Sequence, residues 1–280
     1  MTSQLVCSWA RAKTNAYGCD NFTNHIRCDI SRVSFRHNYH YYEFKSMIYI
    51  SAPFGNYIKH PLATPVTGTW TLEPRSGLIK QILKTLRYDF KTKSWYNSLG
   101  LRNPGIAEGR NRHKRGEIMS IGAINRGDWK ELSEAVAKEI PLELNISCPN
   151  ITHPDHYLEG VEIFPNRCMY MPIVKLSPTD DNKIIDLLFE MGYRKFHLVN
   201  TLKTDRGARS GKILQSYVLE KLIYIRRNYK FQIHVIAGGG ITSIKDIEFY
   251  KRHGAESFSL GTVNFNPWKT KRIINEYHAE

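Results

Sequence analysis

Strand-like apolar runs alternate with stretches of helical spacing along most of this chain, and this alternation constrains its fold more than any other feature. The strand-like runs are residues 47–52, 64–69, 117–123, 142–147, 172–177, 196–201, 233–239 and 257–262. Helical spacing occurs in residues 128–140, 180–192, 216–228, 243–254 and 266–278. Eight strands that mostly alternate with helices over about 250 residues predict a closed parallel (β/α)8 barrel, a TIM barrel, rather than an open doubly wound sheet.

Length and composition agree with one large domain and an extension. The chain has 280 residues, of which 41% are hydrophobic and 12% aromatic, enough to bury a large core. Residues 1–45 show no clear period, so we expect a cap at the bottom of the barrel or an extension that binds a partner, and the barrel itself over 46–280. No apolar run reaches the roughly 18 residues of a membrane span, and no signal peptide is evident, which predicts a cytoplasmic protein.

Cysteine usage and net charge exclude some kinds of site but do not identify the ligand. The five cysteines have no repeating spacing, so we expect reduced thiols without a disulfide framework or a Cys-rich zinc site, and we predict no metal. A net charge of +14 would attract polyanions of any kind, including nucleic acid, anionic cofactors and acidic small molecules. For the densest basic cluster, residues 109–117, a solvated surface loop is favoured over a phosphate-binding loop.

Polar residues and glycines gather at the carboxyl ends of the predicted strands, where a β/α barrel builds its active site. They are Asn145, Ser147, Cys148 and Asn150 after the fourth strand, Lys175 in the fifth, Asn200 and Thr201 after the sixth, Gly238 to Gly240 after the seventh, and Gly261 and Thr262 after the eighth. Glycines after the last two strands, followed by a helix, are typical of a phosphate site built from backbone amides.

Two of these side chains have a choice of roles. Lys175 is flanked by apolar residues, and a place at the barrel mouth, where it would stabilise negative charge on a bound ring, is favoured over costly burial toward the helices. A lone Cys148 would most often be a small buried hydrophobe. Asn145, Ser147 and Asn150 around it favour a functional thiol, because a core position seldom needs so many polar groups.

Several segments together resemble the dihydroorotate dehydrogenase family, whose members are FMN enzymes with a β/α barrel fold. The segments are "YNSLGLRNPGI" (96–106), "LELNISCPN" (142–150), "PIVKLSP" (172–178), "HLVNT" (197–201) and "IAGGGITSIKDIEFYKRHGAESFSLGT" (236–262). Asn-x-Ser-Cys-Pro-Asn is the most specific element, and it is similar to that of the soluble class, which uses cysteine as its base. The resemblance implies oxidation of dihydroorotate to orotate in pyrimidine biosynthesis, with Cys148 taking a proton from C5 and a hydride passing from C6 to FMN.

The resemblance also implies roles for the other site residues. Lys175 would lie by N1 and O2 of the flavin, and Ser147 would join Cys148 and Lys175 in the catalytic set. The implied substrate-binding residues are Asn97, Leu99, Gly100, Leu101, Asn145, Asn150, Asn200 and Thr201. The implied cofactor-binding residues are Ala52, Asn97, Asn145, Lys175, Asn200, Gly211, Gly239, Gly240, Gly261 and Thr262. Related soluble barrels are often dimers, and the electron acceptor, whether fumarate, NAD or another molecule, stays open.

The sequence also departs from the family pattern. Gly68, in "VTGT", stands where the family commonly has a lysine that reaches flavin and substrate. The absence of that lysine would weaken the binding of an anionic substrate. Arg75, Arg102 or Arg110 could compensate. The loop of residues 150–160, which in this family is the lid over the substrate, has its own composition.

Two other functions stay open at this point. The first is a redox-inactive barrel that serves as a binding or structural protein, for nucleic acid through its basic surface, as Gly68 and the unusual first 45 residues suggest. The second is a tRNA dihydrouridine synthase, another FMN barrel, which the net charge would suit. Ser147 stands where that family has glycine, and no helical RNA-binding domain follows residue 265, so nucleic-acid binding is not favoured.

Overall fold

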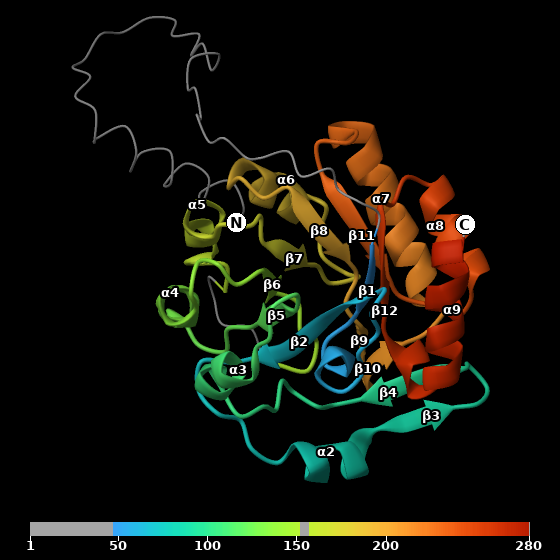
Figure 1. Ribbon diagram of the computed structural model, residues 1–280, viewed down its shortest axis with the longest axis horizontal. Helices are drawn as coiled ribbons and strands as arrows, with labels where there is room; N and C mark the ends of the chain where they lie inside the picture. Colours follow the sequence, from blue (N-terminus) through green and yellow to red (C-terminus); the bar gives the residue numbers. More distant parts are fainter. Residues whose placement is uncertain (1–46, 152–156, 280) are drawn as a thin grey trace, which may run out of the picture. The chain divides into compact units, whose positions relative to one another are not determined.

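The computed structural model describes residues 47–151 and 157–279, and a closed barrel of eight parallel strands lies at its centre (Figure 1). The barrel strands are β1 (Ile48–Ile50), β2 (Thr64–Trp70), β5 (Ile118–Ile121), β6 (Leu142–Asn145), β7 (Ile173–Lys175), β8 (Lys195–Leu198), β11 (His234–Gly238) and β12 (Ser257–Leu260). They follow one another around the barrel in chain order, and β1 closes it by pairing with β12, with Ile48 opposite Phe258. Each strand overlaps a predicted run, so the predicted TIM barrel is confirmed.

Helices follow most of the strands and cover the outside of the barrel (Figure 1). They are α3 (Ile106–Arg112), α4 (Asp128–Ala135), α5 (Phe164–Arg167), α6 (Lys183–Glu190), α7 (Leu214–Tyr229), α8 (Ile244–Arg252) and α9 (Pro267–Ala279), with short 3-10 turns η2 (Phe54–Asn56), η3 (Val161–Ile163) and η4 (Thr262–Phe265). The predicted helices correspond to α4, α6, α7, α8 and α9. Helix α4 ends at Ala135 rather than at residue 140, because buried Val136 takes an extended backbone.

Apolar side chains of the strands form two separate cores. In β7, Val174 belongs to a large cluster that also contains helix residues such as Leu188, whereas its neighbour Ile173 belongs to a small one. Successive side chains of a strand point to opposite faces, so the small cluster fills the interior of the barrel. Its members are Tyr49, Val66, Ile118, Ile173 and Ile236.

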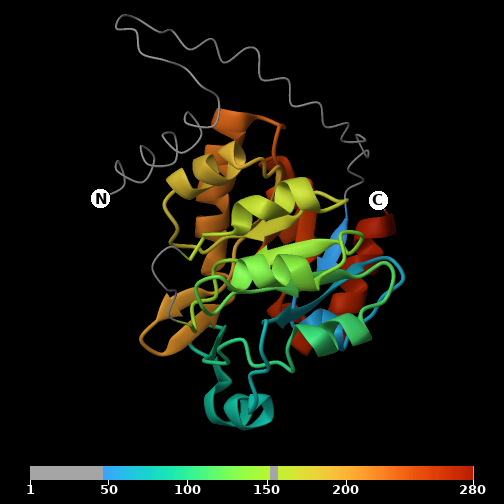
Figure 2. The same cartoon turned by 90° about the vertical axis from the view of Figure 1, so that its left-hand side faces the viewer.

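A second sheet, antiparallel and outside the barrel, is not predicted by the sequence patterns. It contains β3 (Arg87–Asp89), β4 (Ser94–Asn97), β9 (Leu202–Thr204) and β10 (Gly207–Ser210), in the order β3-β4-β10-β9. Helix α2 (Leu78–Thr85) precedes it, and Figure 2 shows this helix projecting beyond the barrel. These strands have only three or four residues, too few to show a period, and β4 pairs with a strand distant in the chain.

Some predictions fall on parts of the chain that the structure does not describe. Residues 1–45 lie outside the described residues, so the division into an extension and a barrel over 46–280 stays a prediction. The loop expected to form the lid is described only at residues 150–151 and 157–160. No helix within the described ranges has the length and apolar character needed to cross a bilayer.

Candidate active site

A cavity of about 1310 Å³ opens at the carboxyl ends of the barrel strands and extends to strands β4 and β10 of the second sheet. Sixteen predicted site residues line it: Ala52, Asn97, Leu99, Gly100, Leu101, Asn145, Cys148, Asn150, Lys175, Asn200, Thr201, Gly211, Gly239, Gly240, Gly261 and Thr262. They come from segments far apart in the sequence, and the closure of the barrel brings them together. Ser147 is the one predicted site residue that is not part of the lining.

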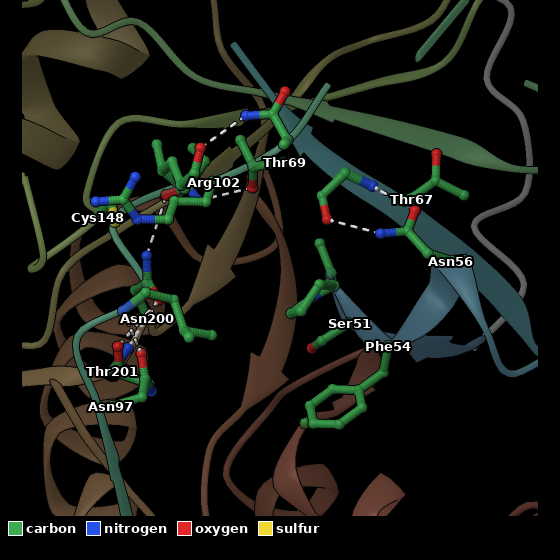
Figure 3. Close-up of a pocket in the computed structure, with 18 of the residues that line it drawn as sticks. Ser51, Phe54, Asn56, Thr67, Thr69, Asn97, Arg102, Cys148, Asn200 and Thr201 are labelled. Atoms are coloured by element: carbon green, nitrogen blue, oxygen red, sulfur yellow. Dashed lines mark hydrogen bonds between the residues drawn. The ribbon is translucent and has the colours of Figure 1, made fainter. Parts of the chain in front are cut away.

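The labelled residues of the cavity form two groups (Figure 3). On one side lie Cys148, Asn97, Asn200 and Thr201, and on the other lie Ser51, which follows β1, Phe54 and Asn56 of η2, and Thr67 of β2. The cavity therefore has a side rich in amides, next to the thiol, and a second side where an aromatic ring and short hydroxyl side chains line the wall.

Cys148 lies three residues beyond the end of β6 and is 6% exposed. Burial raises the pKa of its thiol, while a hydrogen bond to the Asn150 backbone and the cations of Lys175 and Arg75 act in the opposite direction. The thiol is therefore protonated at neutral pH in this structure, and a thiolate formed there would be stabilised by two cations.

A network of side-chain amides orders the side of the cavity next to the thiol. Asn145 Nδ2 donates to Thr69 Oγ1 at 2.9 Å, and Asn200 Nδ2 donates to Asn145 Oδ1 at 3.0 Å. Asn150 Nδ2 donates to Asn97 Oδ1 at 3.0 Å. Asn97, Asn145 and Asn150 keep further donor or acceptor capacity, which suits a ligand ring whose edge alternates between donors and acceptors.

Ser147 lies in the segment after β6, outside the lining of the cavity. Its hydroxyl donates to the backbone oxygen of Lys175 at 2.8 Å and lies 3.3 Å from Asn200 Nδ2, which donates to it. The side chain is 5% exposed and ties the segment after β6 to β7. The part of Ser147 in the catalytic set stays a prediction.

The ends of β11 and β12 form a cradle of backbone groups. Gly239 and Gly240 have φ of +120° and +70°, a region that side chains disfavour, and a Cβ at Gly240 would lie 2.7 Å from Gln215 Cγ. Gly261 has nothing within 4 Å of the place where a Cβ would lie. The 3-10 turn η4 begins at Thr262, so backbone amides border this open space.

The floor of the cavity holds a buried polar cluster that the sequence patterns did not single out. His197 Nδ1 lies 2.7 Å from Glu143 Oε2, and Ser120 Oγ donates to Glu143 Oε1 at 2.9 Å. Burial by itself would raise the pKa of Glu143, but the ammonium of Lys175 and the bond with His197 lower it to about 2. The sequence held a signal for Glu143: it stands two residues before Asn145 in the same strand, so both side chains point to the inward face.

Gly68 lines the cavity but has no room for a side chain. Its φ is +101°, and a Cβ would lie 2.4 Å from the carbonyl oxygen of Ser120. Asn56 fixes this conformation, since Gly68 N–H donates to Asn56 Oδ1 at 2.9 Å and Asn56 Nδ2 donates to Gly68 O at 3.2 Å. The backbone of β2 therefore requires glycine at position 68, and the lysine expected there would not fit this backbone path.

The arginines considered as replacements for that lysine differ in position. Arg75 and Arg102 line the cavity, whereas Arg110 is exposed on α3 and does not. Arg75 Nε donates to the Gly100 carbonyl at 3.2 Å, and its backbone exchanges two hydrogen bonds with Asn103. Arg75 is therefore anchored at the wall of the cavity, where its positive charge acts to lower the pKa of the Cys148 thiol.

Known proteins share both the sequence pattern and the fold of this chain. The family model described as dihydroorotate dehydrogenase matches residues 54–280. The catalytic subunit of dihydroorotate dehydrogenase B (NAD(+)) from Oceanobacillus iheyensis is 29% identical over 216 residues, which cover 64% of this chain and 70% of that protein. The same subunit from Desulforamulus reducens is 28% identical over 248 residues, 76% of this chain and 79% of that protein.

Solved structures have a similar barrel. The crystal structure of a ligand-free DHODH from Eimeria tenella superposes with a TM-score of 0.62 at 19% identity and covers 76% of each chain. At this identity the likeness concerns the fold, and it agrees with the closed barrel described above.

Proposed function

The chain belongs to the dihydroorotate dehydrogenase family, and from this premise we propose that it oxidises dihydroorotate to orotate with FMN as its bound cofactor. The observation that carries the proposal is the shared cavity of Cys148, Lys175 and the glycine ends of β11 and β12. A base, a cation for the ring and a cradle for a phosphate are the groups that this reaction and this cofactor require.

The residues of the cavity fit FMN. Gly261 leaves open space beside backbone amides, and the positive φ of Gly239 and Gly240 shapes the neighbouring backbone, which suits the phosphate. Lys175 is 6% exposed and lines the cavity, so its ammonium suits the N1 and O2 region of the flavin ring. Bound FMN supplies the acceptor for the hydride that leaves C6 of the substrate.

Cys148 is the general base of the proposed reaction. Its thiolate takes the proton from C5 of dihydroorotate, which leaves the negative charge on the substrate, and this charge departs with the hydride from C6 as the C5–C6 double bond forms. Lys175 and Arg75 stabilise the thiolate that must form first. The amides of Asn97, Asn145, Asn150 and Asn200 hold the pyrimidine ring, and the set of substrate contacts is completed by Leu99, Gly100, Leu101 and Thr201.

Arg75 provides positive charge for the substrate carboxylate in a site without the family's second-strand lysine. The guanidinium lies at the cavity wall beside Gly100, which belongs to the segment "SLGL" implied in substrate binding. A guanidinium offers several donors in a plane, a geometry that matches a carboxylate. Arg102 lines the same cavity and adds to the positive potential there.

The test starts from an absorbance spectrum of the purified protein, followed by anaerobic addition of dihydroorotate. We expect a flavin band that bleaches, and we expect Cys148→Ala to retain the band but not to bleach at a comparable rate. A flavin band in the unmodified protein that persists with dihydroorotate would reject the substrate. Absence of flavin after incubation with FMN would reject the enzyme itself.

The family match supports this function over the other two considered from the sequence. The net charge of +14 suited a tRNA dihydrouridine synthase, but it attracts small anions as well as nucleic acid. The redox-inactive binding protein was suggested by Gly68 and by the unusual first 45 residues. The cytoplasmic location and a homodimer remain predictions, and the electron acceptor stays open between fumarate, NAD and another molecule.

A further inference from the structure

His197 lies at the floor of the cavity with no role in the proposed proton transfer. It is 2% exposed, yet it lines the cavity together with Lys175, its register partner on the neighbouring strand. On its other side it lies against Gly238, where an added Cβ would be 2.6 Å from His197 Nε2. The imidazole edge thus occupies the space left by the missing side chain of Gly238.

Glu143 selects the tautomer of this imidazole. His197 Nδ1 lies 2.7 Å from Glu143 Oε2, and the pKa of Glu143, lowered to about 2, keeps that carboxylate ionised. Burial and the nearby ammonium of Lys175 lower the pKa of His197, so its ring is neutral. The single ring proton is therefore on Nδ1, where it is donated to the carboxylate, and Nε2 presents a lone pair.

A hydrogen-bond acceptor at His197 Nε2 can bind only a part of FMN that carries a donor. Lys175 marks the flavin ring end of the cofactor in the proposed site, and Gly239 and Gly240 mark the phosphate end. His197 lies between them, beside Lys175 and Gly238. The ring carbonyls and the phosphate are acceptors and would repel a lone pair, whereas the ribityl chain that links them carries hydroxyl donors.

We propose that His197 positions FMN by accepting a hydrogen bond at Nε2 from a hydroxyl of the ribityl chain, with Glu143 holding the imidazole in the tautomer that this bond requires. The inference rests on the proposed function, since it takes FMN as the ligand of the cavity. Loss of the acceptor leaves a buried hydroxyl without a partner, which weakens binding by about tenfold.

The experiment removes FMN from the protein and measures its rebinding by flavin fluorescence. His197→Phe keeps an aromatic ring but no acceptor, and we expect its Kd for FMN to rise about tenfold. His197→Gln can donate to Glu143 through its amide nitrogen and offer its oxygen to the cavity, so it should bind nearly as tightly as the unmodified protein. His197→Met also removes the acceptor, with a flexible side chain in its place, so the result does not depend on the folding of one variant.

The matched control is His234→Phe. His234 is a buried histidine of the same barrel, 4% exposed, whose Nε2 lies 3.0 Å from Ser257 Oγ, and it does not line the cavity. The same replacement there should leave the Kd for FMN unchanged. A general loosening of the barrel interior would instead weaken FMN in both variants and would overturn the specific role of His197.

FMN analogues that lack one ribityl hydroxyl, at 2′, 3′ or 4′, identify the partner group. One of the three should bind the unmodified protein about tenfold more weakly than FMN and should lose nothing further in His197→Phe. The inference is overturned if His197→Phe and His197→Met bind FMN with the Kd of the unmodified protein. It is also overturned if, for every analogue, the Kd rises relative to that of FMN by the same factor in His197→Phe and in the unmodified protein. Failure of the unmodified protein to bind FMN would overturn the proposed function as well.

Discussion

Cys148 is the residue on which the proposed chemistry depends most directly. Cys148→Ala removes the base and should lower the rate of flavin reduction by dihydroorotate by about 10²- to 10⁴-fold, the usual contribution of a general base. The flavin spectrum should be unchanged, since the thiol is not part of the phosphate cradle. Stopped-flow absorbance under anaerobic conditions measures the rate, and a rate within a factor of two of the unmodified protein would remove Cys148 from the mechanism.

The protonation of the same thiol predicts a pH dependence. Burial raises the pKa of Cys148, so the reactive thiolate is a minor species at neutral pH, and the rate of flavin reduction should rise with pH until that pKa is passed. Arg75→Gln removes a cation that lowers this pKa, so the rise should shift to higher pH. Rate profiles at saturating dihydroorotate check both points, and a flat profile in either protein would contradict them.

Arg75 is also expected to bind the substrate carboxylate. Arg75→Ala should raise the KM for dihydroorotate by about 10- to 100-fold, because a hydrogen bond to a charged group is lost. Arg110→Ala serves as the control, since Arg110 is an exposed arginine outside the cavity. Steady-state kinetics decide the question: equal KM values for the two variants would leave Arg75 without a part in substrate binding.

At the scale of elements, the path of β2 is set by Gly68. Gly68→Ala should destabilise the protein by about 1–3 kcal/mol, because φ is +101° and the new Cβ would lie 2.4 Å from Ser120 O. Gly116→Ala is the matched control: its φ is +90° but nothing lies within 4 Å of its Cβ position, so it carries the backbone strain without the clash. Urea unfolding compares the two variants, and equal losses would mean that the close approach to β5 has no energetic effect.

At the scale of the whole molecule, the net charge of +14 affects how an anionic substrate reaches the cavity. Attraction between the protein and dihydroorotate is screened as salt is added, since the Debye length falls to about 8 Å at 0.15 M ionic strength. We expect kcat/KM to fall several-fold between low and moderate salt while kcat stays constant. A kcat that falls in parallel would point to an effect of salt on the chemistry or on FMN instead.

The second sheet is the part of the molecule that sequence patterns did not predict. Its strands β4 and β10 contribute Asn97 and Ser210 to the cavity, and Arg209 Nε donates to Ser94 Oγ across 115 residues of chain. A pairing over such a separation has no local signature in strands of four residues. The motif around Asn97 identified this residue, while the sheet that holds it became visible only in three dimensions.

Local patterns along the chain are sufficient to define the barrel strands and the place of the site. Apolar periodicity is a property of each strand by itself, and parallel strands in a barrel bring their carboxyl ends to one face, so the amino-acid sequence alone assigns Cys148, Lys175 and Gly239 to one cavity. Contacts between distant segments account for the rest. The contact between Glu143 and His197 joins residues 54 apart, and the backbone of Gly68 is shaped by Ser120 and Asn56. Such contacts arise from the closure of the barrel, which brings together side chains that no pattern along the chain relates.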